Sequence, residues 1–177
     1  MPRKKGKYKV SARKEKRVTA MEAKEVCHTR DAALEKAIEL EGKSFSFYKT
    51  AYQRVQNPDA KTLIKELALE ELEHKYALEK AFFEEVVNLH DRGLMEAPSM
   101  KFAIFLEERP LGETSTSQDV LTYAIHDEQR SVDFYKNFFA QCTGAPMEDL
   151  FKRLSREEEK HLARLEELYE RLYLPEM

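Results

Sequence analysis

Apolar residues recur at spacings of three and four along four long stretches of the chain, which predicts four amphipathic helices. The expected helices cover about residues 31–56, 58–90, 117–141 and 147–173. Only Asn57 separates the first two, as a helix cap before Pro58 at the first helical position, and a short Thr-Gly-Ala-Pro loop separates the last two. Short loops join antiparallel neighbours, whereas the long middle connection places the second and third helices parallel. The pattern therefore predicts an all-α four-helix bundle with one long crossover between helices 2 and 3.

The first two expected helices repeat in the last two at an offset of 87 residues. Residues 37–48 and 124–135 are identical at six of twelve positions, and residues 67–79 and 154–166 at six of thirteen. A constant offset in both helices indicates a duplicated helix pair. The identities include polar residues that interrupt the apolar face of each helix.

Each apolar face carries one glutamate near its middle, and the second and fourth helices add a histidine three residues later. These six residues are Glu41, Glu71, His74, Glu128, Glu158 and His161. A buried carboxylate costs several kcal/mol even after relaxation, and four facing one another would repel. The four faces offer no lysine or arginine to neutralise them.

Bound metal would resolve this conflict, because two divalent cations balance four carboxylates while two neutral imidazoles add no charge. A single Glu-x-x-His is weak evidence, since any glutamate-rich helix can place one on a solvated face. Six such residues at one offset match the dinuclear carboxylate sites of helix bundles. We therefore expect two metal ions, and iron, manganese or zinc would each suit these donors.

Other polar residues near these positions have simpler interpretations. We expect Glu70, Glu73, Glu157 and Glu159 to be solvated because they fall off the apolar faces, and His28, His90 and His126 to lie at the surface. Tyr48 and Tyr135 follow Glu41 and Glu128 by two helical turns. They either pack in the core or donate hydrogen bonds to the metal-binding carboxylates. Ser44 and Ser131 are expected to allow close helix packing.

Composition and charge divide the chain into two parts. Residues 1–17 hold nine Lys/Arg and one Glu, whereas the remainder holds 21 Lys/Arg and 32 Asp/Glu. We expect a basic N-terminal arm over 1–28, ending in a short helix, and the bundle over 29–177. The arm is either a solvated tail or a segment that binds an acidic partner; nucleic acid is a less favoured ligand because the bundle itself is acidic.

The apolar runs and the cysteines indicate in which cellular compartment the protein is expected. The longest apolar run has five residues, Phe102 to Leu106, which excludes a membrane-spanning helix, and no apolar stretch follows the basic start as in a secretory signal. Cys27 and Cys142 are far apart and form no Cys-x-x-Cys motif. We therefore expect no disulfide framework, no zinc knuckle and no rubredoxin-type site, and a reducing cytoplasm as the compartment.

The motifs together resemble the rubrerythrin branch of the ferritin-like di-iron proteins, over about residues 30–174. The carrying motifs are Ala37-Ile38-x-x-Glu41-x6-Tyr48, Glu71-x-x-His74, Ala124-Ile125-x-x-Glu128-x6-Tyr135 and Glu158-x-x-His161. The resemblance implies a ferritin-like bundle in which Glu71 and Glu158 bridge two irons. Glu41 and His74 would complete one iron, and Glu128 and His161 the other.

The implied activity is that of a non-haem di-iron peroxidase or oxidase, in which ferrous iron reacts with peroxide or dioxygen. Rubrerythrins typically carry a further carboxylate where this chain has Ser131, and a rubredoxin domain that this chain lacks. An external electron donor protein is therefore implied, and we expect a homo-oligomer. The ligand set also resembles bacterioferritin, so a ferroxidase remains an alternative, as does a metal-stabilised bundle whose arm binds a partner.

Overall fold

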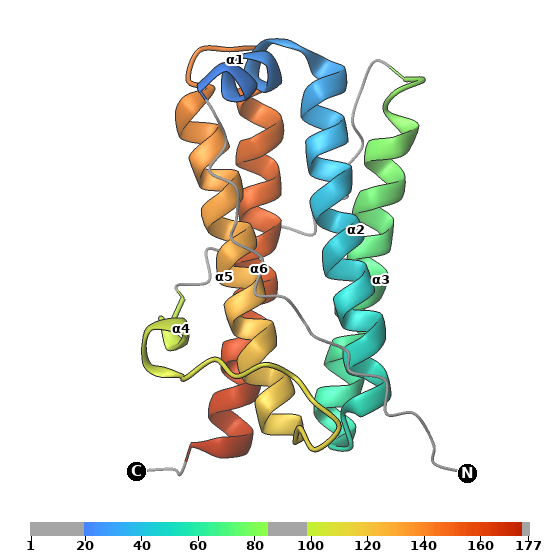
Figure 1. The fold of residues 1–177 in the computed structure, drawn as a ribbon, viewed down its shortest axis with the longest axis vertical. Coiled ribbons are helices and arrows are strands. Elements are labelled where there is room, and N and C mark those ends of the chain that lie inside the picture. The colour runs from blue at the N-terminus through green and yellow to red at the C-terminus, as the bar shows by residue number, and fades with distance from the viewer. Residues whose placement is uncertain (1–19, 85–98, 175–177) are drawn as a thin grey trace, which may run out of the picture.

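Four long helices lie side by side in the computed structural model, which describes residues 20–84 and 99–174 (Figure 1). The helices are α1 (Ala20–His28), α2 (Arg30–Arg54), α3 (Pro58–Lys80), α4 (Phe102–Phe105), α5 (Ser117–Gln141) and α6 (Glu148–Tyr173). The described residues contain no strand. The predicted all-α bundle is therefore confirmed.

The topology follows from the lengths of the connections. The helices α2 and α3 form one antiparallel pair, and α5 and α6 form the other. The long crossover returns the chain so that α3 and α5 run in the same direction (Figure 1). This arrangement gives the two duplicated pairs equivalent positions around one central axis.

Capping side chains define the helix ends. The Asn57 side chain accepts a hydrogen bond from the backbone N–H of Ala60 at the start of α3. At the start of α5, Thr116 and Asp119 form the capping box that their spacing indicates. The helix α3 ends at Lys80, ten residues earlier than we expected. There the Arg30 guanidinium donates to the carbonyl oxygens of Ala81 and Glu84, which a longer helix would use itself. Residues 85–98, including His90 and the expected end of the second helix at about residue 90, lie outside the described residues.

The crossover packs on the second helix pair and contains a short helix, α4, that the sequence pattern did not reveal. The buried carboxylate of Glu166 accepts hydrogen bonds from the backbone N–H groups of Met100 and Phe102, at 2.7 and 2.9 Å. It also lies 3.2 Å from the Ser99 hydroxyl, which donates to it. Farther along, a ring nitrogen of His126 lies 2.9 Å from the carbonyl oxygen of Leu106. These contacts fix the crossover against α5 and α6.

Apolar side chains fill the bundle in two clusters, one toward each end. One cluster includes Ile64, Leu121 and Leu165, and the other includes Leu34, Phe138 and Phe151. Along α2, α3 and α6, the predicted metal-binding residues lie between members of one cluster and members of the other, and Glu128 on α5 lies near that boundary. A polar layer therefore lies between the two apolar clusters, near the middle of the bundle.

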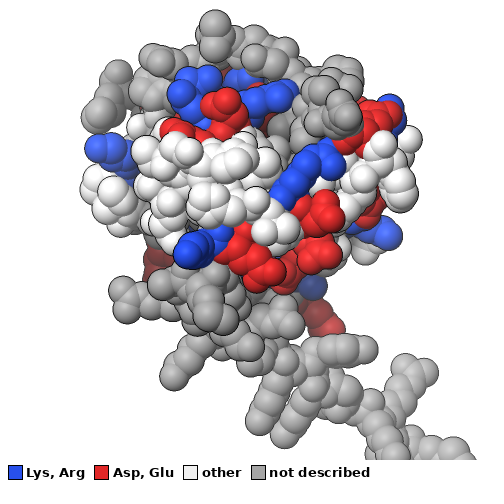
Figure 2. Space-filling view, turned by 90° about the horizontal axis from the view of Figure 1, so that it is seen from above, with Lys and Arg blue, Asp and Glu red and all other residues white. Residues whose placement is uncertain are grey.

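The end of the bundle beside α1 is closed by a disulfide between Cys27 and Cys142. Our expectation of no disulfide is wrong here. The two cysteines are 115 residues apart in sequence and meet only because α1 folds against the end of α5. Both are buried in the apolar cluster at that end. Seen from above, this end of the molecule shows uncharged side chains bordered by charged ones (Figure 2).

Candidate metal centre

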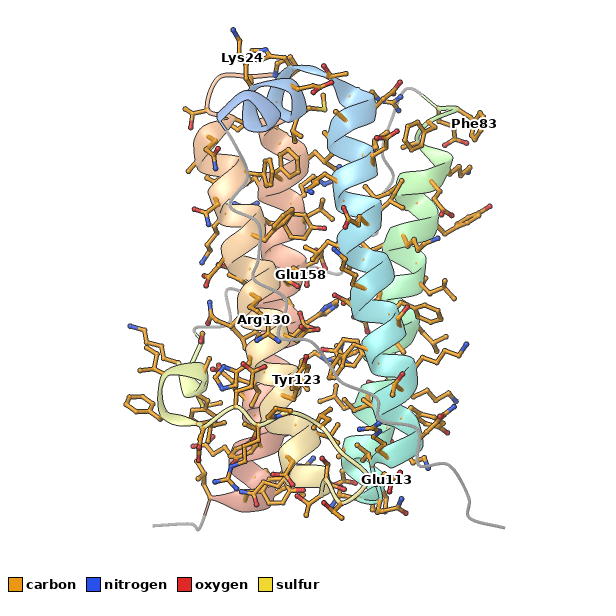
Figure 3. The ribbon with its side chains drawn as sticks, in the orientation of Figure 1. Lys24, Phe83, Glu113, Tyr123, Arg130 and Glu158 are labelled. Carbon is orange, nitrogen blue, oxygen red and sulfur yellow. A yellow bond between two sulfur atoms is a disulfide. The ribbon has the colours of Figure 1, made fainter. Side chains whose placement is uncertain are left out.

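The six predicted metal-binding residues meet in the middle of the bundle, where all four long helices contribute. Glu158 marks this level in Figure 3. The six are at most 7% exposed. Their donor atoms form two groups, each with all atoms within 4.8 Å of one another. The groups are Glu41, Glu71, His74 and Glu158, and Glu71, Glu128, Glu158 and His161.

Two glutamates, Glu71 and Glu158, belong to both groups and so lie between them. The His74 and His161 rings stack with centroids 5.6 Å apart and planes inclined by 11°. Both present Nδ1 to the carboxylates: His74 Nδ1 lies 3.4 Å from Glu41, and His161 Nδ1 lies 2.9 Å from Glu71. Neither contact has the geometry of a hydrogen bond. The arrangement has the two-fold character of the duplicated sequence.

The polar atoms at this centre lack the hydrogen bonds that buried groups normally make. Among the described residues, seven side-chain nitrogen or oxygen atoms are buried without a hydrogen-bond partner, and all seven belong to these six residues. Buried polar groups are almost always satisfied, and an exception demands an explanation. Converging carboxylate oxygens and imidazole nitrogens are donors suited to transition metals. The residues present therefore fit a pair of metal ions.

Burial and mutual repulsion perturb the carboxylates strongly. Burial, followed by the charges of neighbouring glutamates, raises the pKa of Glu71 and of Glu158 well above the usual range. Burial also raises the pKa of Glu128. For Glu41, burial is outweighed by the proximity of His74 and Glu71, and the pKa falls. Without metal, the protonated form is therefore favoured most at Glu71 and Glu158.

Two tyrosines hold the outer oxygens of two of these glutamates. The Tyr48 hydroxyl on α2 donates to Glu128 Oε1 on α5, and the Tyr135 hydroxyl on α5 donates to Glu41 Oε1 on α2. Both tyrosines are fully buried, and burial followed by the nearby carboxylates raises the pKa of each hydroxyl well above 10. Each hydroxyl therefore remains protonated and able to donate. The tyrosines both pack in the core and contact the carboxylates.

The rubrerythrin family model matches the chain over residues 3–98 and 119–177. The chain belongs to the rubrerythrin family. Neither a search of curated proteins nor a search of solved structures finds a match. The family match omits residues 99–118, the part of the crossover that contains α4. The helices that carry the metal centre all lie within the matched segments, which agrees with the resemblance seen in the sequence.

Two glutamates of this rubrerythrin-family chain that we expected to be solvated are not. Glu70 lies against His161, with Oε2 3.1 Å from the ring Nε2, and only 12% of its side chain is exposed. Glu157 is buried and pairs with Lys160 at 2.8 Å. The duplication could have indicated that both are buried, because Glu70 and Glu157 are identical at the 87-residue offset.

The other polar residues are less closely tied to the centre. Glu73 is exposed, and Glu159 is partly exposed and pairs with Lys136 at 2.6 Å. His28 is exposed, and His126 is partly buried beside the crossover. Ser44 and Ser131 are buried.

Two features concern the chain beyond the centre. None of the described helices has the length and apolarity needed to cross a membrane. The basic arm falls mostly on residues 1–19, outside the described residues, and its boundary with the bundle stays a prediction. Its expected short helix corresponds to α1.

Proposed function

We propose that this protein is a non-haem di-iron oxidoreductase that reacts with peroxide or dioxygen. The observation that carries the proposal is the set of seven orphaned donor atoms on two groups that share Glu71 and Glu158. Glu71 and Glu158 would bridge two irons. Glu41 and His74 would complete one iron site, and Glu128 and His161 the other. Ferrous ions held there would supply the two electrons that reduce peroxide, with two protons, to water.

The chain itself contributes orientation, charge balance and exclusion of water. The tyrosine hydroxyls fix Oε1 of Glu41 and of Glu128, so that the unpartnered Oε2 of each is left for a metal. Four carboxylates neutralise two divalent ions in a dry layer between two apolar clusters. Protons displaced from Glu71 and Glu158 by metal binding must leave, so loading is linked to pH. The burial of all six residues favours a small oxidant over a large organic substrate.

For repeated turnover we propose an external electron donor protein, since Cys27 and Cys142 are paired with each other and form no rubredoxin-type site in this sequence. The closest alternative is a ferroxidase, which oxidises iron without reducing peroxide catalytically. The serine at position 131, where rubrerythrins typically carry a further carboxylate, favours that alternative.

An anaerobic titration separates the two functions. Protein loaded with two ferrous ions is mixed with hydrogen peroxide, and the absorbance of ferric iron is followed. We expect one peroxide to be consumed per two irons, and continuous peroxide consumption when a reductant is added. Release of ferric iron without renewed peroxide consumption would instead identify a ferroxidase.

The assembly and the compartment are further parts of the proposal. Leu69, Leu72 and Tyr76 lie at spacings of three and four on α3 and are 50%, 41% and 65% exposed, which supports a homo-oligomer formed through this face. Light scattering on the purified protein tests it. We propose the cytoplasm, although the Cys27–Cys142 disulfide removes the part of the sequence argument that rested on unpaired cysteines. In that compartment reduced thiols are the norm, so thiol labelling in intact cells would show whether Cys27 and Cys142 are paired there.

A further inference from the structure

The internal duplication breaks down beside the two imidazoles. At the 87-residue offset, Glu70 corresponds to Glu157, but Arg164 corresponds to Ala77 and Lys160 to Glu73. The six metal-binding residues are identical in the two halves, whereas the cations Arg164 and Lys160 have no counterpart in the first half. The two halves of the centre therefore differ in the charged residues that lie near their imidazoles.

On one side, a chain of charged contacts reaches the outer nitrogen of His161. The ring Nε2 lies 3.1 Å from Glu70 Oε2, and Glu70 Oε1 accepts a hydrogen bond from Arg164 at 2.9 Å. The second guanidinium nitrogen of Arg164 donates to Glu66 at 2.7 Å. Because two acidic side chains hold Arg164 and Arg164 holds Glu70, the carboxylate is fixed against the imidazole. Because the Arg164 guanidinium occupies Glu70 Oε1, Oε2 is the oxygen left to accept from the imidazole.

On the other side, the equivalent carboxylate is directed elsewhere. Glu157 accepts from Lys160 on its own helix at 2.8 Å. Within residues 20–84 and 99–174, no hydrogen bond joins Glu157 to His74, and the contact recorded for His74 with a carboxylate is that of Nδ1 with Glu41. The position of Arg164 is taken by Ala77, which has no charge to hold a carboxylate there.

We propose that Glu70 is a positioning residue that makes the Glu128–His161 half of the centre bind metal first and more tightly than the Glu41–His74 half. The inference rests on the proposed metal-binding function. A carboxylate that accepts the Nε2–H hydrogen fixes the tautomer, leaves the Nδ1 lone pair facing the cavity and makes that nitrogen a stronger ligand. Among the residues that the structure describes, His74 has no such partner, so its tautomer is selected as metal binds. Unequal halves give a centre that loads in two steps.

Zinc is a suitable probe because it is diamagnetic and takes carboxylate and imidazole ligands. The full chain, labelled with 15N in histidine, is titrated with zinc, and the imidazole nitrogens are followed by NMR. At one equivalent we expect the His161 nitrogens to shift while those of His74 stay in place. A chelator competition should resolve two binding steps.

Four variants assign the asymmetry to Glu70. Glu70→Leu removes the acceptor and should weaken the tighter step by about 10- to 100-fold. Glu70→Gln keeps an acceptor oxygen and should restore part of the loss. Glu157→Leu, the matched change in the other half, should leave the order of loading unchanged. Arg164→Gln releases Glu70 without altering a neighbour of Glu71, and should act in the same direction as Glu70→Leu if that variant folds poorly.

The outcomes separate this inference from the function on which it rests. Zinc binding in which His74 shifts first, or both histidines shift together, would overturn the role of Glu70 and leave the metal centre standing. Equal effects of Glu70→Leu and Glu157→Leu would do the same. A wild-type chain that takes up no zinc would overturn both the metal centre and the inference.

Discussion

Tyr135 on α5 donates its hydroxyl hydrogen to Glu41 on α2, across the bundle. Its duplicated counterpart, Tyr48 on α2, donates to Glu128 on α5. Each tyrosine thus contacts the glutamate of the other helix pair, although Glu41 and Tyr48 lie on one face of the same helix. The crossed pairing connects the two pairs at the level where like charges gather, and leaves Oε2 of both glutamates toward the cavity.

Removing either hydroxyl should weaken metal binding without unfolding the bundle. In Tyr135→Phe and Tyr48→Phe, one carboxylate oxygen loses its donor and the glutamate is no longer held in the orientation that a metal requires. We expect a loss of about 10- to 100-fold in metal affinity for each variant, measured by chelator competition. Tyr52→Phe is the matched control, because Tyr52 lies on α2 but is 38% exposed. Unchanged affinity in all three variants would show that the hydroxyls only fill space.

The shared carboxylates should be indispensable for metal and unfavourable without it. Replacing both Glu71 and Glu158 by Gln removes the proposed bridges, so we expect metal content to fall to background in elemental analysis. The metal-free double variant should be at least as stable as the wild type in urea, because two buried ionisable groups are gone. Glu35→Gln with Glu167→Gln removes the same charge from exposed positions and should keep the metal. Full metal content in the Glu71/Glu158 variant would exclude them as bridges.

The same two residues predict how the stability of the metal-free wild type depends on pH. Their pKa values are raised in the folded state, so the folded protein binds more protons than the unfolded chain above the ordinary pKa of 4.5. The free energy of unfolding should therefore fall as pH rises from about 5 toward neutrality. Urea midpoints of metal-free protein at a series of pH values test this. The Glu71→Gln, Glu158→Gln variant should show a flatter profile, and a wild-type profile that rises over this range would contradict the assignment.

Much of this centre follows from the sequence because metal-binding residues are fixed by helical period. Glu41, Glu71, Glu128 and Glu158 interrupt an apolar face, and a four-helix topology can bring such positions to one level only. The crossed tyrosine hydrogen bonds and the Glu70–His161 contact could not be predicted in this way. They join different helices, and the sequence pattern does not define how those helices are placed against each other. A residue one position off the apolar face, such as Glu70, is solvated on an isolated helix and buried only when α6 packs beside it.

The crossover shows a second limit of the sequence pattern. Four residues of helix, Phe102–Phe105, are too short to show a period, and they are held by hydrogen bonds to a side chain more than 60 residues away. Glu79 and Glu166 are equivalent positions in the duplication and are both glutamate. Even so, Glu79 is exposed, whereas Glu166 is buried under the crossover. Only one copy of the helix pair has a crossover to anchor, so the duplication cannot predict this difference.

That difference gives a direct test of what anchors the crossover. Glu166→Ala leaves the N–H groups of Met100 and Phe102 without their acceptor, and should lower the free energy of unfolding by about 1–3 kcal/mol. Glu79→Ala, the duplicated position, removes an exposed side chain and should change it by less than about 0.5 kcal/mol. Urea unfolding of both variants measures the contrast. Equal effects would show that the crossover is held by other contacts.

Reduction of the Cys27–Cys142 disulfide should cost stability but not metal. The crosslink closes a long loop and should stabilise the fold by about 2–4 kcal/mol through the unfolded chain. Dithiothreitol should therefore lower the melting temperature of the wild type. Cys27→Ala with Cys142→Ala should melt at the lower temperature with or without reductant, and both forms should keep their metal, since neither cysteine belongs to the donor groups. Loss of metal on reduction would link the end of the bundle to its centre.

Residues 1–17 should be dispensable for the metal chemistry. They carry a net charge of +8 against −11 for the rest of the chain, and none of the six donors. A segment of that charge is attracted to acidic protein surface, on the same bundle or on a partner, and a bundle this acidic would itself repel nucleic acid. Deleting residues 1–17 keeps α1 and Cys27, so we expect unchanged iron content and peroxide reactivity. Light scattering should instead show an assembly whose dependence on salt is altered, because exposed charges are screened beyond about 10 Å at 0.1 M salt. A truncated chain that loses its iron would show that the arm helps to build the centre, and the division at residue 28 would have to be redrawn.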